Sequence, residues 1–273
     1  MEKSFQQKAK MGGSTNSTFL ALIPKEVNLC TFERFRPISL CNSSYKILAK
    51  LLANRIRPLL GKLISTSQGG FIKGRHIIDN VIQFQEAIHS SFHRKEQGMI
   101  IKLDMVNAFD RVKHSFLFKA LLSFGFSTNF VNLIKACISN PWIAPLVNGR
   151  PTNYFQATRG IRQGYPLSPF LYILMADALS RKLDAEKKVR TVPGIRIVKG
   201  IEPINHSLFV DDSLLLGGAS IIISKAFSRI LQDFCSITGA LINKKKSAVH
   251  RWNTEQNAIN RIANNLGFSG YAS

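Results

Sequence analysis

The sequence predicts an α/β fold, in which short apolar strands alternate with amphipathic helices. Two observations predict it. The segment 206–216, H-S-L-F-V-D-D-S-L-L-L, has two apolar runs around Asp211 and Asp212, a pattern typical of a β-hairpin with both carboxylates at its tip. The segment 99–104, M-I-I-K-L-D, predicts a buried strand that ends on Asp104, and segments with helical periodicity follow it.

The paired aspartates have two interpretations. Asp favours turns because its side chain bonds nearby backbone, so an isolated Asp-Asp pair is most often a solvated turn. Adjacent carboxylates can also hold a divalent cation, since Mg²⁺ binds one or two carboxylates together with substrate phosphates. The rest of the chain decides between these interpretations.

The composition indicates a core-forming chain with a polyanionic partner. Of the 273 residues, 45% are hydrophobic, enough for one large domain or two closely joined lobes. Lys and Arg total 37 against 16 Asp and Glu, a net charge of +21. This excess is spread over apolar-containing segments, which indicates nucleic acid or an anionic membrane surface as the partner. No apolar run reaches about 18 residues, so no membrane span is expected.

The four cysteines predict neither a zinc site nor a disulfide framework. They are far apart and show no C-x-x-C spacing, so we expect reduced residues of an intracellular protein. The N-terminus lacks the apolar core of a signal peptide. The four are Cys30, Cys41, Cys137 and Cys235.

The N-terminal part predicts a disordered segment, 1–20, followed by short extended pieces and a helix. Ser43 or Ser44 would cap this helix, which runs to about Arg57. Lys46 lies on a face that is either solvated or turned toward phosphates. The apolar stripe of the helix is Leu48, Leu52, Ile56 and Leu59.

A glycine-rich basic loop comes next, S-Q-G-G-F-I-K-G-R at 67–75. Its glycines favour close backbone approach, and Lys73 and Arg75 would suit phosphate oxygens. The helix that follows, from about Ile77 to Phe92, is expected to turn its isoleucines inward. These are Ile78, Ile82 and Ile88.

The remaining segments predict further helices, a hairpin and two loops. The hairpin, 145–157, surrounds an Asn-Gly pair, the strongest turn signal of the chain. The loop 158–169, T-R-G-I-R-Q-G-Y-P-L-S-P, has more arginine, glycine and glutamine than a plain connector needs. A strand-like piece at 240–247, A-L-I-N-K-K-K-S, presents cations. The predicted helices are 113–124, 127–138, one from Ser168, and one capped by Ser220 and ended by Gly239.

A strand that ends in Asp104, a Gly/Gln/Arg loop that leads into a helix, and a hairpin tipped by Asp211 and Asp212 form the layout that two-metal phosphoryl transfer requires. Carboxylates from two neighbouring strands can hold two cations, and basic residues around them can neutralise phosphate charge.

The chain resembles the reverse transcriptase domain of a plant non-LTR retrotransposon of the long interspersed element type. Six segments carry the resemblance in family order, and six ordered motifs are far more specific than one. They are F-R-P-I-S-L-C-N-S-S-Y-K-I-L-A-K-L-L-A-N-R-I, S-Q-G-G-F-I-K-G-R-H-I-I-D-N, K-L-D-M-V-N-A-F-D-R-V, R-G-I-R-Q-G-Y-P-L-S-P-F-L-Y, L-F-V-D-D-S-L-L-L and T-G-A-L-I-N-K-K-K-S.

The resemblance implies a right-hand polymerase palm, an antiparallel sheet backed by helices, with a smaller fingers lobe before it. The fingers would span 21–98 and the palm 99–250. Residues 251–273 would be a C-terminal remnant, with the thumb largely missing.

The resemblance also implies the catalytic and metal-binding residues. Asp104, Asp211 and Asp212 would be the catalytic carboxylates. Asp104, Asp211 and the Met105 carbonyl would bind Mg²⁺, with Mn²⁺ as an alternative. Phe109 would exclude a 2′-hydroxyl and so favour deoxynucleotides.

The nucleotide-binding residues are implied in the same way. Gln163 and Gly164 would line the nucleotide and template pocket, and Lys246 would lie near the pyrophosphate. The triphosphate would be held from the fingers, and the resemblance leaves the residue open among Arg36, Lys46 and Arg75.

Three departures from the family pattern stand out. Tyr165 replaces a usual Asp, which is expected to disturb a loop that touches the primer–template. Val106-Asn107 replaces Ser-Lys, and Val210 replaces a smaller Ala. No ligand carboxylate is lost.

The function implied is RNA-directed DNA polymerisation in the nucleus, with an RNA template, a DNA primer or RNA–DNA hybrid and deoxynucleoside triphosphates, and no membrane. The alternative is an inactive reverse-transcriptase-like remnant that binds RNA or hybrid. A group II intron maturase is a third interpretation, which would need a maturase domain after the palm.

Overall fold

The computed structural model describes residues 5, 15–25 and 35–270. Contacts within the chain divide it into two compact units. Unit 1 comprises residues 1–60 and 109–174, and unit 2 comprises residues 61–108 and 175–273. The units interleave along the chain, whereas the fingers and palm segments expected from the sequence are contiguous. Helix α7 (Ser168–Lys188) contributes residues to both units.

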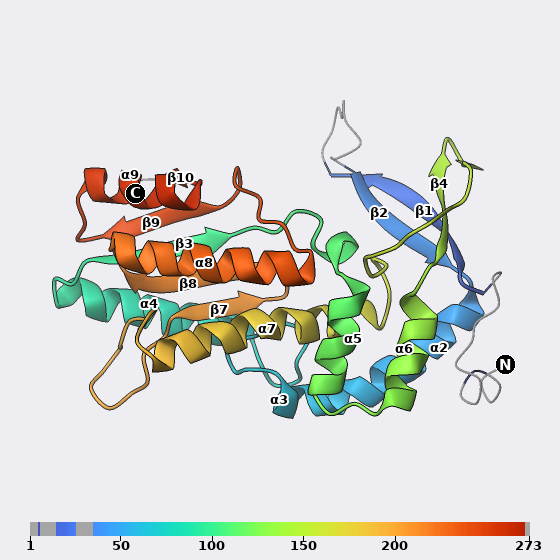
Figure 1. Cartoon of the computed structure of the whole chain (residues 1–273), viewed down its shortest axis with the longest axis horizontal. Coiled ribbons are helices and arrows are strands. Elements are labelled where there is room, and N and C mark those ends of the chain that lie inside the picture. The colour runs from blue at the N-terminus through green and yellow to red at the C-terminus, as the bar shows by residue number, and fades with distance from the viewer. Residues whose placement is uncertain (1–4, 6–14, 26–34, 271–273) are drawn as a thin grey trace. The chain divides into compact units, whose positions relative to one another are not determined.

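Unit 2 contains a five-stranded sheet with the strand order β10-β9-β3-β8-β7 (Figure 1). The central strand β3 pairs antiparallel with β8 and β9, and β7 pairs antiparallel with β8. The predicted buried strand and the predicted hairpin are therefore confirmed. The strands are β3 (Gly98–Leu103), β7 (His206–Phe209), β8 (Asp212–Gly218), β9 (Ala248–Trp252) and β10 (Ser269–Gly270).

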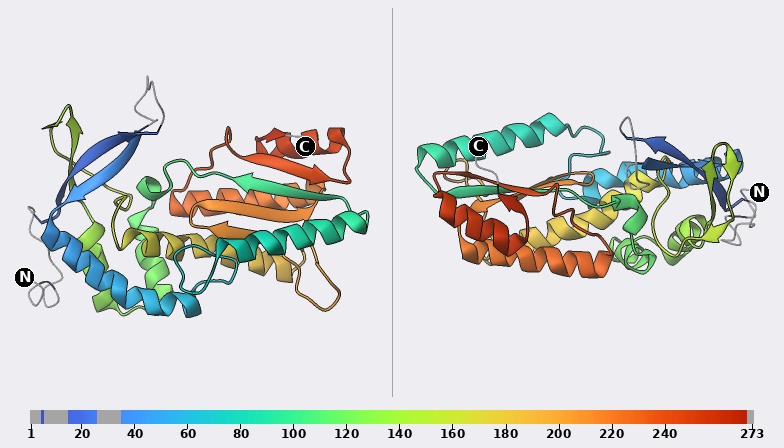
Figure 2. Two further views of the ribbon diagram at one scale, coloured as in Figure 1. Left: turned by 180° about the vertical axis from the view of Figure 1, so that it is seen from behind. Right: turned by 90° about the horizontal axis from the view of Figure 1, so that it is seen from above.

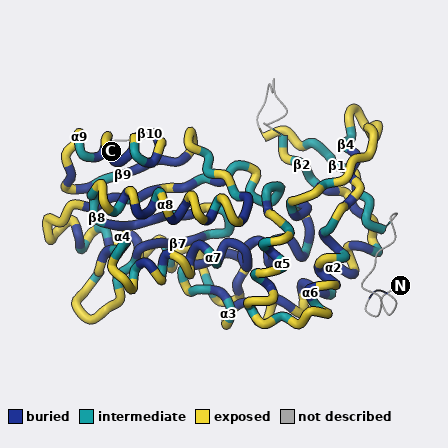
Figure 3. Tube along the Cα trace, viewed as in Figure 1, coloured by how far each residue is buried: buried dark blue, intermediate teal, exposed yellow. Residues whose placement is uncertain are grey.

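Helices cover both faces of this sheet. Helix α4 (Ile77–His93) lies on one face, and α8 (Ile221–Thr238) and α9 (Gln256–Leu266) lie on the other (Figure 2). Helix α8 begins and ends as predicted, because the Ser220 Oγ accepts the Ile223 N–H at 3.2 Å and Gly239 closes the helix with φ +84°. The central strands are buried between these layers (Figure 3).

The face that α4 turns to the sheet differs from the prediction. Ile78 and Ile82 are 55% and 50% exposed, whereas Ile88 packs on the core as predicted. The buried positions are Phe84, Ala87 and Ser91. The reason lies in β9, where the indole Nε1 of Trp252 donates a hydrogen bond to the Ser91 Oγ at 3.0 Å. A small polar side chain therefore belongs to the inward face.

The C-terminal stretch expected to be a remnant is part of the core of unit 2 as far as the described residues extend. Helix α9 packs on α8, and the Asn265 Nδ2 donates to the Ser224 Oγ at 3.2 Å. Its buried residues are Ile259, Ile262, Ala263 and Leu266.

Unit 1 contains a second sheet, with the order β2-β1-β4-β5 and β6 beside β4. Strand β1 pairs antiparallel with β2 and parallel with β4. Asn148 and Gly149 join β4 to β5 with φ of +50° and +77°, so the predicted turn is confirmed. The strands are β1 (Ser17–Pro24), β2 (Phe35–Cys41), β4 (Trp142–Val147), β5 (Arg150–Pro151) and β6 (Phe155–Gln156).

The prediction of disorder over residues 1–20 is wrong for 17–20. These residues pair with strands on both sides, and buried Thr18 accepts a hydrogen bond from the Cys41 Sγ at 2.7 Å. Sheet pairing outweighs the polar local composition. Residues 1–4 and 6–14 of the same prediction lie outside the described residues.

The helices of unit 1 follow the predicted pattern with two corrections. The cap of α2 is Asn42, whose Oδ1 accepts the Tyr45 N–H at 2.8 Å, and not Ser43 or Ser44. Leu59 is 43% exposed, because a 3-10 turn follows α2 and takes it off the stripe. Besides α7, the helical elements that start in this unit are α2 (Ser43–Ile56), η2 (Arg57–Leu59), α3 (Leu60–Leu63), α5 (His114–Ser123) and α6 (Thr128–Ile138).

Three of the four cysteines belong to the described residues, and Cys41, Cys137 and Cys235 form no disulfide there. Cys30 lies outside the described residues. Across the described residues, every helix is either too short or too polar to cross a bilayer.

Candidate active site

Asp104, Asp211 and Asp212 lie at the same end of the unit 2 sheet. Leu103, the last residue of β3, pairs with Ser213 of β8. The turn between β7 and β8 consists of Val210 and Asp211, and Asp212 begins β8. Because Asp104 directly follows Leu103, the antiparallel register brings Asp104 level with Asp212. The hairpin tip and the end of β3 thus carry neighbouring carboxylates.

The three carboxylates influence one another electrostatically. Burial raises the pKa of the half-buried Asp211, a backbone hydrogen bond lowers it, and the negative charges of Asp212 and Asp104 raise it further. Hard oxygen donors on adjacent strands suit a divalent cation. Within the described part of the chain, however, no group of three or more His, Cys, Asp or Glu side chains is arranged to hold a metal ion.

The glycine-rich loop supports the hairpin tip, a role that its sequence did not reveal. Gln68 is fully buried, and its Oε1 accepts the backbone N–H groups of Gly70 at 2.8 Å and Val210 at 3.0 Å. The backbone of the loop also pairs with Leu208 of β7. The Gln68 Nε2 is buried without a partner among the described residues, so only the oxygen end of this amide acts in the support.

Val210 adopts a left-handed backbone conformation, with φ +58°. This region is costly for a β-branched residue. Its Cγ2 would lie 2.6 Å from a Cβ on Gly70, so a glycine at that position makes room for it. Val210, which replaces the Ala of the family pattern, thus lies beside a glycine that leaves space for its larger side chain.

The segment 240–247 pairs with the chain just after β3. The Asn243 N–H donates to the Asp104 carbonyl and the Val106 N–H donates to the Leu241 carbonyl, both at 2.8 Å. Exposed Lys246 lies in the turn that follows Asn243. The backbone thus brings the predicted pyrophosphate-side lysine close in the fold to Asp104. Met105, the predicted carbonyl ligand, is buried beside Ile242.

The three cations predicted for the triphosphate differ in their surroundings. The Arg75 guanidinium donates to several backbone carbonyls of the 61–68 stretch, including Gln68 at 2.9 Å and Ile64 at 3.0 Å. Its donors therefore brace this loop. Arg36 on β2 and Lys46 on α2 are exposed.

Phe109, the predicted sugar-facing residue, is held by its ring and its backbone. It belongs to the short 3-10 element η3 (Ala108–Arg111). Its ring stacks on that of buried Tyr172, with centroids 4.7 Å apart and an interplanar angle of 25°. Its carbonyl accepts the Ile161 N–H at 2.8 Å. Sequence reasoning did not identify Tyr172.

Gln163 and Gly164 lie in the loop before α7. The Gln163 carbonyl accepts the Ser39 N–H of β2 at 3.3 Å, and Gly164 has φ +87°, which favours glycine. A pocket of about 230 Å³ adjoins this loop in unit 1. Its polar lining includes Ser39, Asp110, Arg159, Arg162 and Gln163.

Tyr165 packs inside unit 1. Its ring meets Tyr45 edge to face at 4.8 Å, and the buried guanidinium of Arg162 lies 4.4 Å from the Tyr45 ring centroid. The Arg162 Nη2 donates to the carbonyl and the Oδ1 of Asn16 at 2.7 and 2.6 Å. The Tyr165 hydroxyl and the Nε and Nη1 of Arg162 are buried without partners among the described residues. The replacement of the usual Asp thus leaves a buried cation stacked on aromatic rings.

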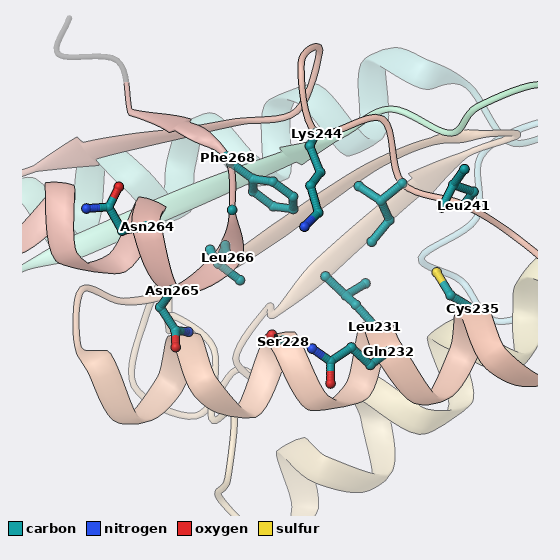
Figure 4. Close-up of a pocket in the computed structure, with 12 residues that line it drawn as sticks. Ser228, Leu231, Gln232, Cys235, Leu241, Lys244, Asn264, Asn265, Leu266 and Phe268 are labelled. Carbon is teal, nitrogen blue, oxygen red and sulfur yellow. Dashed lines mark hydrogen bonds between the residues drawn. The ribbon is translucent and has the colours of Figure 1, made fainter.

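A second pocket, of about 310 Å³, lies between α8 and α9 in unit 2 (Figure 4). Apolar side chains such as Leu231 and Phe268 form much of its wall, and the Lys244 side chain extends into it (Figure 4). None of the predicted site residues lines this pocket.

Comparisons with known proteins identify the family of the chain. The sequence model of the family described as "Reverse transcriptase (RNA-dependent DNA polymerase)" matches residues 23–268. The transposon TX1 uncharacterized 149 kDa protein of Xenopus laevis is 28% identical over 89% of this chain and 18% of its own length. The retrovirus-related Pol polyprotein from the type-1 retrotransposable element R2 of Popillia japonica is 29% identical over 83% of this chain and 31% of its own length. The chain thus spans less than a third of these relatives.

The structural comparison shows the fold. Apo telomerase from Candida tropicalis, truncated from its C-terminal domain, matches with a TM-score of 0.58 at 14% identity, over 90% of this chain and 52% of that one. The α/β architecture, with sheets backed by helices, is the one that the sequence predicted, and the match in fold agrees with the right-hand polymerase fold that the resemblance implied. Since the family model covers nearly the whole sequence, the chain belongs to the reverse transcriptase (RNA-dependent DNA polymerase) family.

Proposed function

We propose that this chain catalyses RNA-directed DNA synthesis, in which the 3′-hydroxyl of a primer attacks the α-phosphate of a deoxynucleoside triphosphate opposite an RNA template. One observation carries the proposal. The antiparallel register of β3, β8 and β7 brings Asp104 level with Asp212 and next to Asp211. Family membership supplies the reaction class.

Each proposed role has a structural support. Asp104 and Asp211 would hold divalent cations, with the Met105 carbonyl as a further donor, and Asp212 would add negative charge beside them. When bound, such cations activate the attacking hydroxyl and stabilise the leaving pyrophosphate. Lys246, in the loop paired with Asp104, would neutralise phosphate charge.

Further residues would contact the nucleotide in this proposal. Phe109, backed by Tyr172, would restrict space at the 2′-position of the sugar. Gln163 and Gly164 would line the nucleotide and template pocket. Arg36 and Lys46 are the better candidates for the triphosphate, since Arg75 already donates to backbone carbonyls.

We also propose that the chain comes from a plant non-LTR element and acts in the nucleus on RNA and RNA–DNA hybrid. The net charge of +21 supports a polyanionic partner. A plant source is supported by 41% identity over 68 residues to the uncharacterized mitochondrial protein AtMg01250 of Arabidopsis thaliana.

Primer extension on an RNA template tests the function. The purified chain is incubated with deoxynucleotides and Mg²⁺, Mn²⁺ or EDTA, beside the double variant Asp211→Ala, Asp212→Ala. Extension by the wild type with a divalent cation, and none by the variant, is expected. Equal extension by both would refute the role of the hairpin carboxylates. No extension by a folded wild type under any metal condition would refute the activity of this chain.

A second candidate is a non-catalytic binder of RNA or hybrid. Tyr165, which stands where the family pattern has Asp and is buried in unit 1, favours it. Filter binding of labelled hybrid distinguishes the two, because a binder retains hybrid yet incorporates no nucleotide with either metal.

A further inference from the structure

The side chains of Asp110 and Gln163 form a pair within the unit 1 pocket. The Gln163 Nε2 donates to both carboxylate oxygens of Asp110, at 3.3 and 3.1 Å. Both residues line the same pocket, together with Arg159. We propose that Asp110 is a positioning residue that fixes the carboxamide of Gln163, so that its Oε1 faces the bound nucleotide or template as an acceptor. This inference rests on the function proposed above.

The chemistry of the pair selects one orientation of the amide. An ionised carboxylate only accepts hydrogen bonds, whereas a carboxamide has a donor end and an acceptor end. Turning the Gln163 oxygen toward Asp110 would place two acceptors in contact, with no proton between them. The NH₂ group must therefore face Asp110, and the Oε1 is directed away from it.

The backbone around the pair is fixed as well. The Gly160 N–H donates to the Val112 carbonyl and the Ile161 N–H donates to the Phe109 carbonyl, both at 2.8 Å. A Cβ on Gly160 would lie 2.7 Å from the Asp110 carbonyl oxygen, so this close approach requires glycine. These bonds hold the two segments at a set distance, and the side-chain pair then fixes the remaining rotation of the amide.

The hydrogen bond between Gln163 and Asp110 is energetically important because the carboxylate is partly shielded from water. Asp110 is half-buried, and burial raises the pKa of its carboxyl group, while the Gln163 amide and the positive charge of Lys25 lower it. A buried carboxylate that loses its donor pays its full desolvation cost. Gln163 thus stabilises Asp110 while Asp110 orients Gln163. An acceptor held in this way would select a hydroxyl or amino group of the ligand.

Steady-state primer extension with a double-mutant cycle tests the proposal. Asp110→Asn is expected to raise KM for the deoxynucleotide about tenfold, with kcat within about twofold, because the amide can then adopt both orientations. The same substitution in a Gln163→Ala background is expected to add no further increase. An equal increase in both backgrounds would show that Asp110 acts independently of Gln163 and would overturn the proposal.

An exchange of the two groups provides a rescue test. In the double variant Asp110→Asn, Gln163→Glu, the asparagine NH₂ can donate to one glutamate oxygen and leave the other as the outward acceptor. KM is expected to return to within about threefold of wild type, whereas Gln163→Glu alone, with two carboxylates in contact, is expected to stay impaired. Failure of the exchange, with the fold intact by circular dichroism, would count against positioning.

A measurement without turnover separates this inference from the proposed function. The side-chain NH₂ resonances of Gln163, identified by their absence in Gln163→Ala, are expected to shift in Asp110→Asn and to stay in place in the exposed control Asp233→Asn. Unshifted resonances in Asp110→Asn would overturn the pairing, whether or not the chain extends primers. Shifted resonances in a chain that extends no primer would support the pairing and refute only the proposed activity.

Discussion

The Oε1 of Gln68 accepts the backbone N–H of Val210 at 3.0 Å, across 142 residues of sequence. Gln68 is fully buried, and Val210 is the first residue of the turn that carries Asp211. A loop that precedes β3 therefore sets the backbone of the turn between β7 and β8. The position of the candidate metal-binding carboxylate depends on this amide.

Substitution of Gln68 by Leu is expected to lower the free energy of unfolding by about 2–3 kcal/mol, since it leaves two buried N–H groups without an acceptor. Urea denaturation measures this loss. Gln85→Leu, an exposed glutamine on α4, serves as the control and is expected to change stability by less than about 0.5 kcal/mol. Equal effects of both variants would contradict the role of the Gln68 amide.

Gly70 and Val210 are expected to be energetically coupled. Gly70→Ala should destabilise the chain by about 1–3 kcal/mol, because the new Cβ would lie 2.6 Å from the Val210 Cγ2. Val210→Ala removes that atom and the β-branch at φ +58°, so alone it should be neutral or stabilising by up to about 1 kcal/mol.

A thermodynamic cycle of these two variants and their combination measures the coupling. Gly70→Ala is expected to cost about 1 kcal/mol less in the Val210→Ala background. Strictly additive effects would contradict the steric relationship.

Asp211 predicts a pH-dependent effect on stability. Its folded-state pKa is raised, first by burial and then by Asp212 and Asp104, so the folded chain holds the proton more tightly than the unfolded chain. The cost of the charged form is absent well below the ordinary Asp pKa of about 3.9, and it is fully present above the raised value. Asp211→Asn should therefore stabilise the metal-free chain at pH 7, and the gain should fade toward pH 4.

Urea denaturation in EDTA at both pH values checks this prediction. A gain for Asp211→Asn that is the same at pH 4 and pH 7 would contradict it. In primer extension the same variant is expected to lose activity, since an amide is a poor substitute for a carboxylate toward a divalent cation.

The buried cluster of Arg162, Tyr165 and Tyr45 predicts opposite effects of two substitutions. Tyr165→Phe removes a buried hydroxyl that has no partner among the described residues, so it should raise the free energy of unfolding by about 1 kcal/mol. Arg162→Met removes the hydrogen bonds to Asn16 and the stacking on Tyr45. This substitution should lower the free energy of unfolding by about 2 kcal/mol. Thermal denaturation compares the two, and loss of stability in Tyr165→Phe would contradict the assignment.

Local patterns in the sequence predicted much of the fold. The hairpin at Asn148-Gly149, the cap at Ser220 and the stop at Gly239 depend on neighbouring residues, and the structure contains all three. The inward face of α4 was mispredicted, because Trp252 determines it from 161 residues away in sequence. Periodicity within a helix carries no information about such a partner.

The residues of the candidate site also fall into those that the sequence indicated and those that it did not. The motifs around Asp104, Asp211 and Gln163 were visible because their side chains are chemically distinctive. The contributions of Gln68, Asp110 and Tyr172 were not, since each acts by contacting a residue far away in sequence. A glutamine, an aspartate and a tyrosine look ordinary in a sequence until their partners are known.

The pairing of β3 with β9 has a consequence for synthesis on the ribosome. Gly98 pairs with Trp252, so the partner of this central strand is made 252 − 98, or 154, residues later. At a translation rate of about 5–20 residues per second, the apolar strand M-I-I-K-L waits roughly 8–30 s before β9 emerges. During that time its backbone edge and buried face are available to other nascent chains. We therefore expect the yield of soluble protein in bacterial expression to depend on chaperones that bind nascent polypeptides. This dependence should be stronger than the stability of the folded chain alone would indicate.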